Sequence, residues 1–227
     1  MAGIVFTLCI SIGLPLIAFI YACIKKKYIP FLLGTLAFIV SQMLIRLPLI
    51  QYLQDNSPTY MMFSITKPLL FSIIIGLSAG VFEGLARYIF MRFFMKQRDW
   101  QSGFLFGAGH GGIEAILLVG IGAIMILFLP NAMTSNGEFF IAGIERLFAM
   151  LLHIGLSIIV LQGVVQRKFI YILLAMLIHG LVDNLVVVFP LYLSANYALI
   201  AIEVSLAIIA LITFGYSLLL KRKGVLT

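Results

Sequence analysis

Charged residues are scarce in this chain of 227 residues, of which 10% are charged and 63% are hydrophobic. Soluble domains have about 25% charged and about 45–50% apolar residues, so the composition excludes an ordinary soluble protein. The basic residues stand in short clusters between apolar runs, which argues against nucleic-acid binding despite a formal net charge of +7. We therefore expect an integral membrane protein that contacts lipids and has no nucleic-acid partner.

Several familiar chemical motifs are also missing. The two cysteines, Cys9 and Cys23, share one apolar run without metal-ligand spacing, so we expect both to be free. There is no phosphate-binding loop, glycine-rich dinucleotide motif after a strand, Cys-x-x-Cys or His-Glu-x-x-His sequence. The last absence removes one zinc-protease signature. It leaves zinc possible, because three histidines with an open fourth position form another catalytic zinc arrangement.

Seven apolar segments are long enough to cross a membrane as helices. The short alternating strands of an outer-membrane barrel are absent from the sequence. We predict an all-α polytopic fold in a single integral membrane domain over 1–227, with a loop at about 51–67. The spans are expected at roughly 3–24, 29–50, 68–94, 103–129, 139–165, 169–190 and 196–220.

The basic residues predict the orientation of these spans. Of the 15 lysines and arginines, most follow the first, third, fifth and seventh segments, whereas the loops of the other side hold only Lys67. The positive-inside rule makes the basic side cytosolic. We therefore predict an N-terminus outside, a cytosolic C-terminus and a multi-pass location in the plasma membrane.

Ionisable residues remain inside the predicted spans, although each costs about 2.5–3.5 kcal/mol near the bilayer centre. They are Arg46, Glu83, Arg87, His110, Glu114, Glu145, Arg146, His153, His179, Asp183 and Glu203. At about 1.5 Å per residue, four of them share a layer about 15–18 Å from the cytosolic ends, namely Glu83, Glu114, His153 and His179. We expect a polar site there. Arg46, Glu145 and Arg146 are expected to be structural charges near the outer surface, and Glu203 has no assigned role.

Spacing within the segments adds two constraints. Pairs four residues apart, which share a helix face, are Glu83 with Arg87, His110 with Glu114, and His179 with Asp183. Glycines recur at every fourth position in the third and fourth segments, at Gly76, Gly80, Gly84, Gly103, Gly107 and Gly111. Because small-residue stripes let membrane helices approach closely, we predict that these two segments pack on each other and bring Glu83 near His110.

Four functions, which belong to three classes, suit this set of residues. Glu83, held by Arg87 and assisted by His110, can act as a general base toward water. Alternatively, His110, His153 and His179 can hold a zinc ion. Intramembrane acids and histidines also build proton relays, so a proton-coupled transporter is a third possibility. A non-catalytic membrane scaffold is the fourth.

Four short segments resemble the motifs of the YhfC family: Phe82–Arg87, Phe106–Glu114, Ile144–His153 and His179–Asn184. That family is grouped with the type II CAAX prenyl proteases and the PrsW proteases, which are glutamic-type intramembrane peptidases. The resemblance covers the third to sixth segments and implies a catalytic core at about 68–190. The sequence departs from the pattern at Gly84, where related proteins usually have a second glutamate.

The resemblance implies an intramembrane endopeptidase that acts on membrane-associated proteins or on peptides, with glutamic chemistry favoured and no cofactor expected. Under it, Glu83 activates a water with the help of His110. His179, with Asp183 or Asn184, binds the developing oxyanion, and His153 and Glu114 complete the site. A zinc protease is the alternative within the same class, and the transporter and scaffold are the alternatives outside it.

Overall fold

The computed structural model describes residues 1–128 and 136–226. Within them, seven helices are long and apolar enough to cross a membrane, which confirms the all-α polytopic prediction. These spans are Ala2–Ile24, Tyr28–Asn56, Pro68–Phe94, Trp100–Leu127, Asn136–Gln166, Ile170–Tyr192 and Ala195–Arg222. Residue 129, the predicted end of the fourth span, lies outside the described residues.

The first four spans each contain a short π-helical segment, labelled η. They divide into α1 (Ala2–Leu8), η1 (Cys9–Gly13) and α2 (Leu14–Ile24); α3 (Tyr28–Phe38), η2 (Ile39–Arg46) and α4 (Leu47–Asn56); α6 (Pro68–Ile89) and η3 (Phe90–Phe94); and α7 (Trp100–Ala115), η4 (Ile116–Gly120) and α8 (Ile121–Leu127). The last three spans are uninterrupted: α9 (Asn136–Gln166), α10 (Ile170–Tyr192) and α11 (Ala195–Arg222). π-Helical turns often occur at functional sites.

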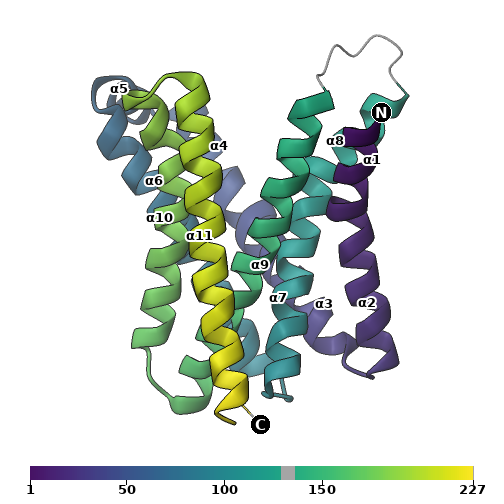
Figure 1. Cartoon of the computed structure of the whole chain (residues 1–227). Helices are drawn as coiled ribbons and strands as arrows, with labels where there is room; N and C mark the ends of the chain where they lie inside the picture. The colour runs from purple at the N-terminus through teal and green to yellow at the C-terminus, as the bar shows by residue number, and fades with distance from the viewer. Residues whose placement is uncertain (129–135, 227) are drawn as a thin grey trace.

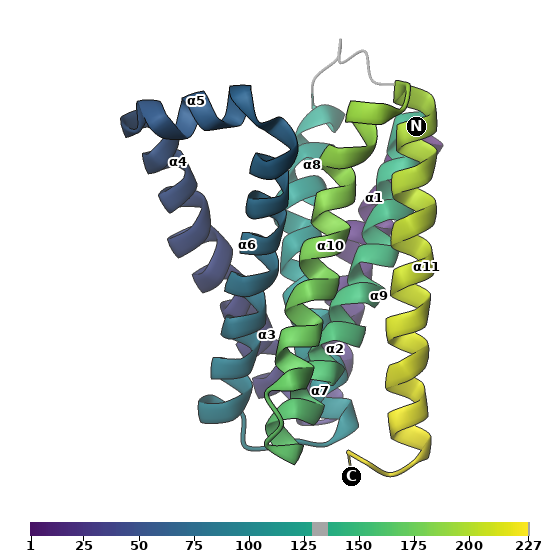
Figure 2. The same cartoon turned by 90° about the vertical axis from the view of Figure 1, so that its left-hand side faces the viewer.

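A short helix, α5 (Pro58–Thr66), occupies part of the region predicted as a loop at 51–67. Ser57 caps this helix by accepting a hydrogen bond from the Tyr60 backbone N–H at 3.2 Å. Pro58 and Pro68 each stand at the start of a helix, where the missing N–H of proline is tolerated. Figure 2 shows α5 lying across one end of the bundle between α4 and α6. The loop prediction was wrong because these turn residues mark helix boundaries and not a continuous loop.

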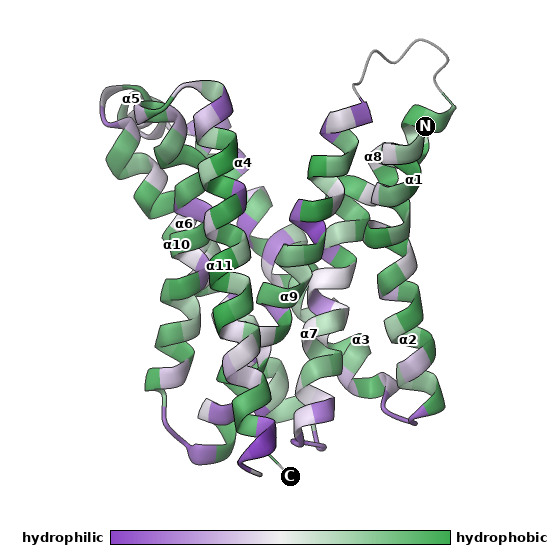
Figure 3. Cartoon of the chain, in the orientation of Figure 1, coloured by the Kyte–Doolittle hydropathy of each residue, from purple (hydrophilic) through white to green (hydrophobic). Residues whose placement is uncertain are grey.

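Helix α9 is the central helix of the bundle. In its most apolar stretch 83% of the residues are buried, whereas the share for every other span is 39% or less. It packs against α1, α7, α10 and α11, as Figure 1 shows. The outward faces of the surrounding helices are mostly apolar (Figure 3), as expected for surfaces in contact with lipid.

The chain ends lie at opposite ends of the bundle (Figure 1), as an odd number of spans requires. Hydrophilic turns gather at the C-terminal end (Figure 3), where Lys27 Nζ donates a hydrogen bond to Asp99 Oδ1. Partial burial raises the pKa of Asp99, but hydrogen bonds from Lys27 and Ser102 outweigh burial and hold the pKa below its usual value. That the C-terminal end faces the cytosol stays a prediction.

The glycine stripes of the third and fourth spans do not pack on each other. The α6 stripe faces α10: a Cβ atom on Gly80 would lie 2.2 Å from the Met176 carbonyl oxygen. The α7 stripe faces α9: a Cβ atom on Gly107 would lie 2.5 Å from Ile154 Cα. The predicted packing of the two segments on each other was wrong, because a stripe shows that a helix is approached closely without identifying the neighbour.

We predict that Gly80→Ala destabilises the protein, because the new methyl group must push α6 away from α10. The expected loss in the free energy of unfolding is about 1–3 kcal/mol. Gly215→Ala is the matched control, since its Cβ would meet nothing within 4 Å. In a helix interior with space for the methyl group, changing glycine to alanine raises the free energy of unfolding by up to about 1 kcal/mol. The unfolding midpoints in detergent measure both, and equal stability of the two variants would contradict the close α6–α10 contact.

Candidate functional site

Glu83 lies in the third span with its side chain 5% exposed. Its Oε1 accepts a hydrogen bond from Gln42 Nε2 at 2.7 Å, and its Oε2 accepts one from Arg87 Nη2 at 3.0 Å. His110 Nε2 lies 2.9 Å from the same Oε2 atom. The predicted pairing with Arg87 and the predicted approach of His110 are therefore confirmed, and the carboxylate is held from the second, third and fourth spans.

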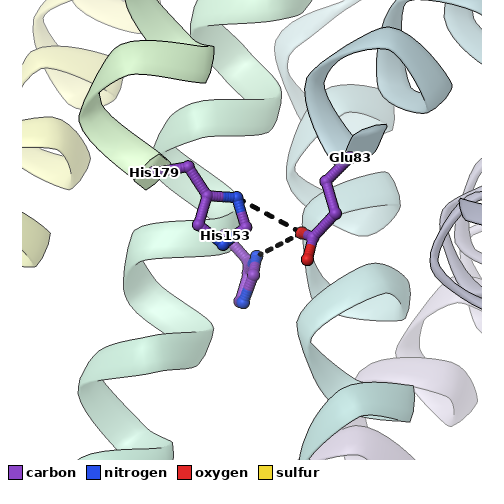
Figure 4. Close-up of side chains that lie close together, drawn as sticks. All are labelled: Glu83, His153 and His179. Carbon is purple, nitrogen blue, oxygen red and sulfur yellow. Dashed lines mark ion pairs between the residues drawn. The ribbon is translucent and has the colours of Figure 1, made fainter. Parts of the chain in front are cut away.

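Two further histidines turn toward the same carboxylate oxygen. His179 Nδ1, from α10, lies 3.3 Å from Glu83 Oε2, and His153 Nδ1, from α9, lies 3.9 Å from it. Figure 4 shows the two imidazoles converging on the carboxylate from neighbouring helices. Both histidines are buried. Residues from spans three to six thus meet around one oxygen atom of Glu83, as the shared depth of the polar residues predicted, and Gln42 of the second span bonds the other oxygen.

A second carboxylate stands behind each of these two imidazoles. His153 Nε2 lies 2.5 Å from Glu114 Oε2, and His179 Nε2 lies 3.6 Å from Asp183 Oδ2. A carboxylate hydrogen-bonded to the far nitrogen fixes the tautomer and orientation of a histidine. Glu114 is near enough to do so for His153, whereas Asp183 lies beyond hydrogen-bond distance from His179. Asn184, the alternative partner of His179, instead donates to a carbonyl of its own helix at 2.7 Å and packs against α6.

Arg146 extends this set of charges along α9. Its Nη1 donates to Glu114 Oε1 at 3.0 Å, and its Nη2 donates to Glu145. The structural pairing expected for Glu145 and Arg146 is therefore present, but it is joined to the site through Glu114. Glu203 Oε2 is buried and has no hydrogen-bond partner among the described residues.

Two residues of η2, Gln42 and Arg46, also belong to this network. Gln42 was not predicted as a site residue, and Arg46 was predicted only as a structural charge. Arg46 Nη1 donates to Gln42 Oε1 at 3.0 Å, and Gln42 in turn donates to Glu83. Arg46 also donates to Ser78 Oγ at 3.0 Å and to the Ile75 carbonyl at 2.9 Å. Arg46 was expected to be a structural charge near the outer surface, and its bond to Gln42 also joins it to the residues around Glu83. The available signal was a glutamine four residues before an arginine in an otherwise apolar segment.

Three of the buried residues have the chemistry of a metal site. Glu83, His153 and His179 each offer one ligand atom, and these atoms all lie within 4.8 Å of one another. Two histidines and one glutamate, with a fourth position open, form a known set of catalytic zinc ligands. His110 stands outside this set, which therefore differs from the three-histidine set considered from the sequence.

Arg87 contacts two of the three ligand atoms. Its Nη2 lies 2.7 Å from His153 Nδ1 and 3.0 Å from Glu83 Oε2. A guanidinium and a metal ion need the same lone pairs, so Arg87 must turn away where a metal is bound. Arg87 Nε is buried without a hydrogen-bond partner, so no bond at that atom holds the guanidinium in place.

The family model described as YhfC intramembrane metalloprotease matches residues 8–139 and 130–204. The chain belongs to the YhfC family. This confirms the resemblance found in the four motifs and places the chain in a family of intramembrane proteases. The description of the family names a metal-dependent type, whereas the resemblance to the CAAX and PrsW proteases implied a glutamic type.

One relative supports the family assignment over most of the chain. The "Uncharacterized membrane protein YhfC" of Bacillus subtilis (strain 168) is 33% identical over 231 residues, which cover 87% of this chain and 88% of the relative. No solved structure matches this YhfC-family chain. The chain is thus a multi-pass membrane protein of the YhfC family.

We predict that Arg146→Met destabilises the protein by about 3–5 kcal/mol, because it leaves the Glu114 carboxylate buried without its cation. Adding Glu114→Gln should restore part of the loss, since the uncompensated charge is then removed. The control is Lys27→Met at the half-exposed Lys27–Asp99 pair, for which we expect a loss within about 1 kcal/mol. Unfolding midpoints of the wild type, Arg146→Met, Glu114→Gln and the double variant give the coupling energy, and additive effects of the Arg146 and Glu114 changes would show that the pair is not coupled.

Proposed function

We propose that this YhfC-family chain is an intramembrane endopeptidase for membrane-associated proteins or peptides, with a zinc ion held by Glu83, His153 and His179. The supporting observation is the orientation of the two imidazoles. Each turns Nδ1 toward Glu83 and Nε2 toward a second carboxylate, Glu114 or Asp183. Carboxylates behind ligand histidines are the usual outer partners of a catalytic zinc site.

The site also has the parts that peptide hydrolysis needs. Bound zinc supplies a Lewis acid that polarises a carbonyl and makes water nucleophilic near neutral pH. His110 lies beside Glu83, and its Nδ1 is buried without a hydrogen-bond partner. We propose that His110 accepts the proton that water loses when the water oxygen attacks the scissile carbonyl carbon. His110 then returns that proton to the amine nitrogen as the C–N bond breaks.

Arg87 has two positions in this proposal. In the structure its guanidinium pairs with the Glu83 carboxylate and lies within hydrogen-bond distance of His153 Nδ1. Turned away from His153, it keeps a fixed positive charge beside the reacting carbonyl. Such a charge stabilises the oxyanion that develops during attack.

A metal-free mechanism is the second candidate, and the contacts of Arg87 favour it. In this mechanism Arg87 keeps its contacts with Glu83 and His153. Glu83 is the general base toward water, and His110 shares the proton that the water loses. His179, with Asp183 beside it, then donates a hydrogen bond to the oxyanion. This is the chemistry that the resemblance to the glutamic-type peptidases implied.

The proposal is tested by profiling new protein N-termini in membranes of cells that express the wild type or a variant at matched levels. We expect cleavage products with the wild type and with Asp55→Asn, a carboxylate neutralised at the exposed end of α4. We expect none with Glu83→Gln. His110→Ala should slow cleavage by about 10²–10⁴-fold, the usual contribution of a general acid–base residue.

A chelator arm separates the two mechanisms. Cleavage that stops when metal is removed and resumes when zinc is restored supports the zinc site. Cleavage that continues in metal-free membranes supports the glutamate mechanism. Identical N-termini with wild type and Glu83→Gln would contradict both, and the transporter or the scaffold would then be the better account.

A further inference from the structure

Three arginines converge on adjoining cavities at the C-terminal end of the bundle, away from the site around Glu83. A cavity of about 330 Å³ is lined by Arg92, Arg98 and Arg167 together with Val164 and the C-terminal residues Val225 and Leu226. A second cavity of about 150 Å³ shares Arg92 and Arg167 and extends along Tyr88 and Phe169. The two cavities therefore share the guanidinium groups of Arg92 and Arg167, and each has further lining residues of its own.

The backbone brings the arginines together from separate parts of the chain. Arg92 lies in η3 at the end of the third span, and Arg167 directly follows α9 in a left-handed conformation with φ 56°. Arg98 lies in the turn after η3, where its Nη2 donates to the Arg92 carbonyl at 2.7 Å. The Trp100 backbone N–H donates to the Leu226 carbonyl at 3.1 Å and so holds the C-terminal segment against the larger cavity.

No acidic side chain lines either cavity. Among the described residues, the guanidinium groups of Arg92 and Arg167 have no hydrogen-bond or ion-pair partner, and Asp99, the nearby acid in the sequence, is paired with Lys27. Guanidinium groups gathered without an acid repel one another, and an anion between them removes that repulsion. The charge of this pocket is therefore complementary to an anionic ligand.

The position of the pocket identifies the class of anion. Arg92 and Arg167 stand where the third and fifth spans end, at the level where lipid headgroups meet the protein. The planar fork of arginine matches the oxygens of a phosphate group. The smaller cavity shares Val164 with the larger one and adds the apolar residues Phe169 and Ile172, which suit the upper part of an acyl chain. Basic pockets between membrane helices are typical sites for anionic lipids.

We propose that Arg92, Arg98 and Arg167 form a binding site for the phosphate group of an anionic phospholipid. The lipid phosphate lies among the three guanidinium groups, and one acyl chain follows the apolar wall of the smaller cavity. The site is independent of the proposed protease chemistry, since it shares no residue with the group around Glu83.

The test is native mass spectrometry of the full chain in detergent with phosphatidylglycerol or phosphatidylcholine added. The wild type should retain phosphatidylglycerol in preference to phosphatidylcholine. Arg92→Gln with Arg167→Gln should weaken phosphatidylglycerol binding about 30-fold, which corresponds to about 1 kcal/mol for each arginine. The matched control, Lys96→Gln with Lys168→Gln, removes two exposed charges from the same end without touching either cavity and should bind as the wild type does.

Two arms make the result decisive. An equal loss in both double variants, or no preference for phosphatidylglycerol in the wild type, overturns the proposal. Unfolding midpoints in uncharged detergent establish that the arginine variant is folded.

Added inorganic phosphate that displaces phosphatidylglycerol at low concentration would identify free phosphate as the ligand and overturn the lipid assignment. Displacement only by a second anionic lipid supports it.

Discussion

The structure depends on keeping the Glu83 carboxylate inside the membrane-spanning region. A charge there is costly unless cations and hydrogen-bond donors surround it. Arg87, Gln42 and His110 contact its two oxygens, and His153 and His179 turn toward one of them. Because these residues come from five spans, satisfying one carboxylate fixes how those spans are arranged. The central position of α9 follows from the same requirement, since its polar residues face inward on a helix buried on most sides.

The sequence predicted the elements and the membership of the site better than the contacts between elements. Hydrophobic length predicts a span, and an ionisable residue within a span predicts an inward face, so the seven helices and the layer containing Glu83, His153 and His179 followed directly. Periodicity does not say which neighbour a face meets. The glycine stripes on α6 and α7 were therefore assigned to the wrong partners. Gln42 was overlooked, and Arg46 was not connected with the site, because neither pairs with an acid in its own segment.

Two observations concern the cation at the proposed catalytic group. The carboxylates behind His153 and His179 resemble the surroundings of a zinc site, in keeping with the description of the YhfC family. Arg87 occupies the contacts that a metal ion would take. Both observations fit one site with two exchangeable cations, a tethered guanidinium and a metal ion. The positions of Glu83, His110 and the two carboxylates serve either state.

The zinc content of the purified full chain tests the proposed metal centre most directly. We predict about one zinc ion per chain in the wild type, with loss in His153→Ala and in His179→Ala. His110→Ala should retain the metal, as should the double variant Cys9→Ala with Cys23→Ala, because these residues lie outside the ligand set. Loss of zinc in His110→Ala would indicate the three-histidine set instead. An active wild type without zinc, or zinc retained in both His153→Ala and His179→Ala, would contradict the account.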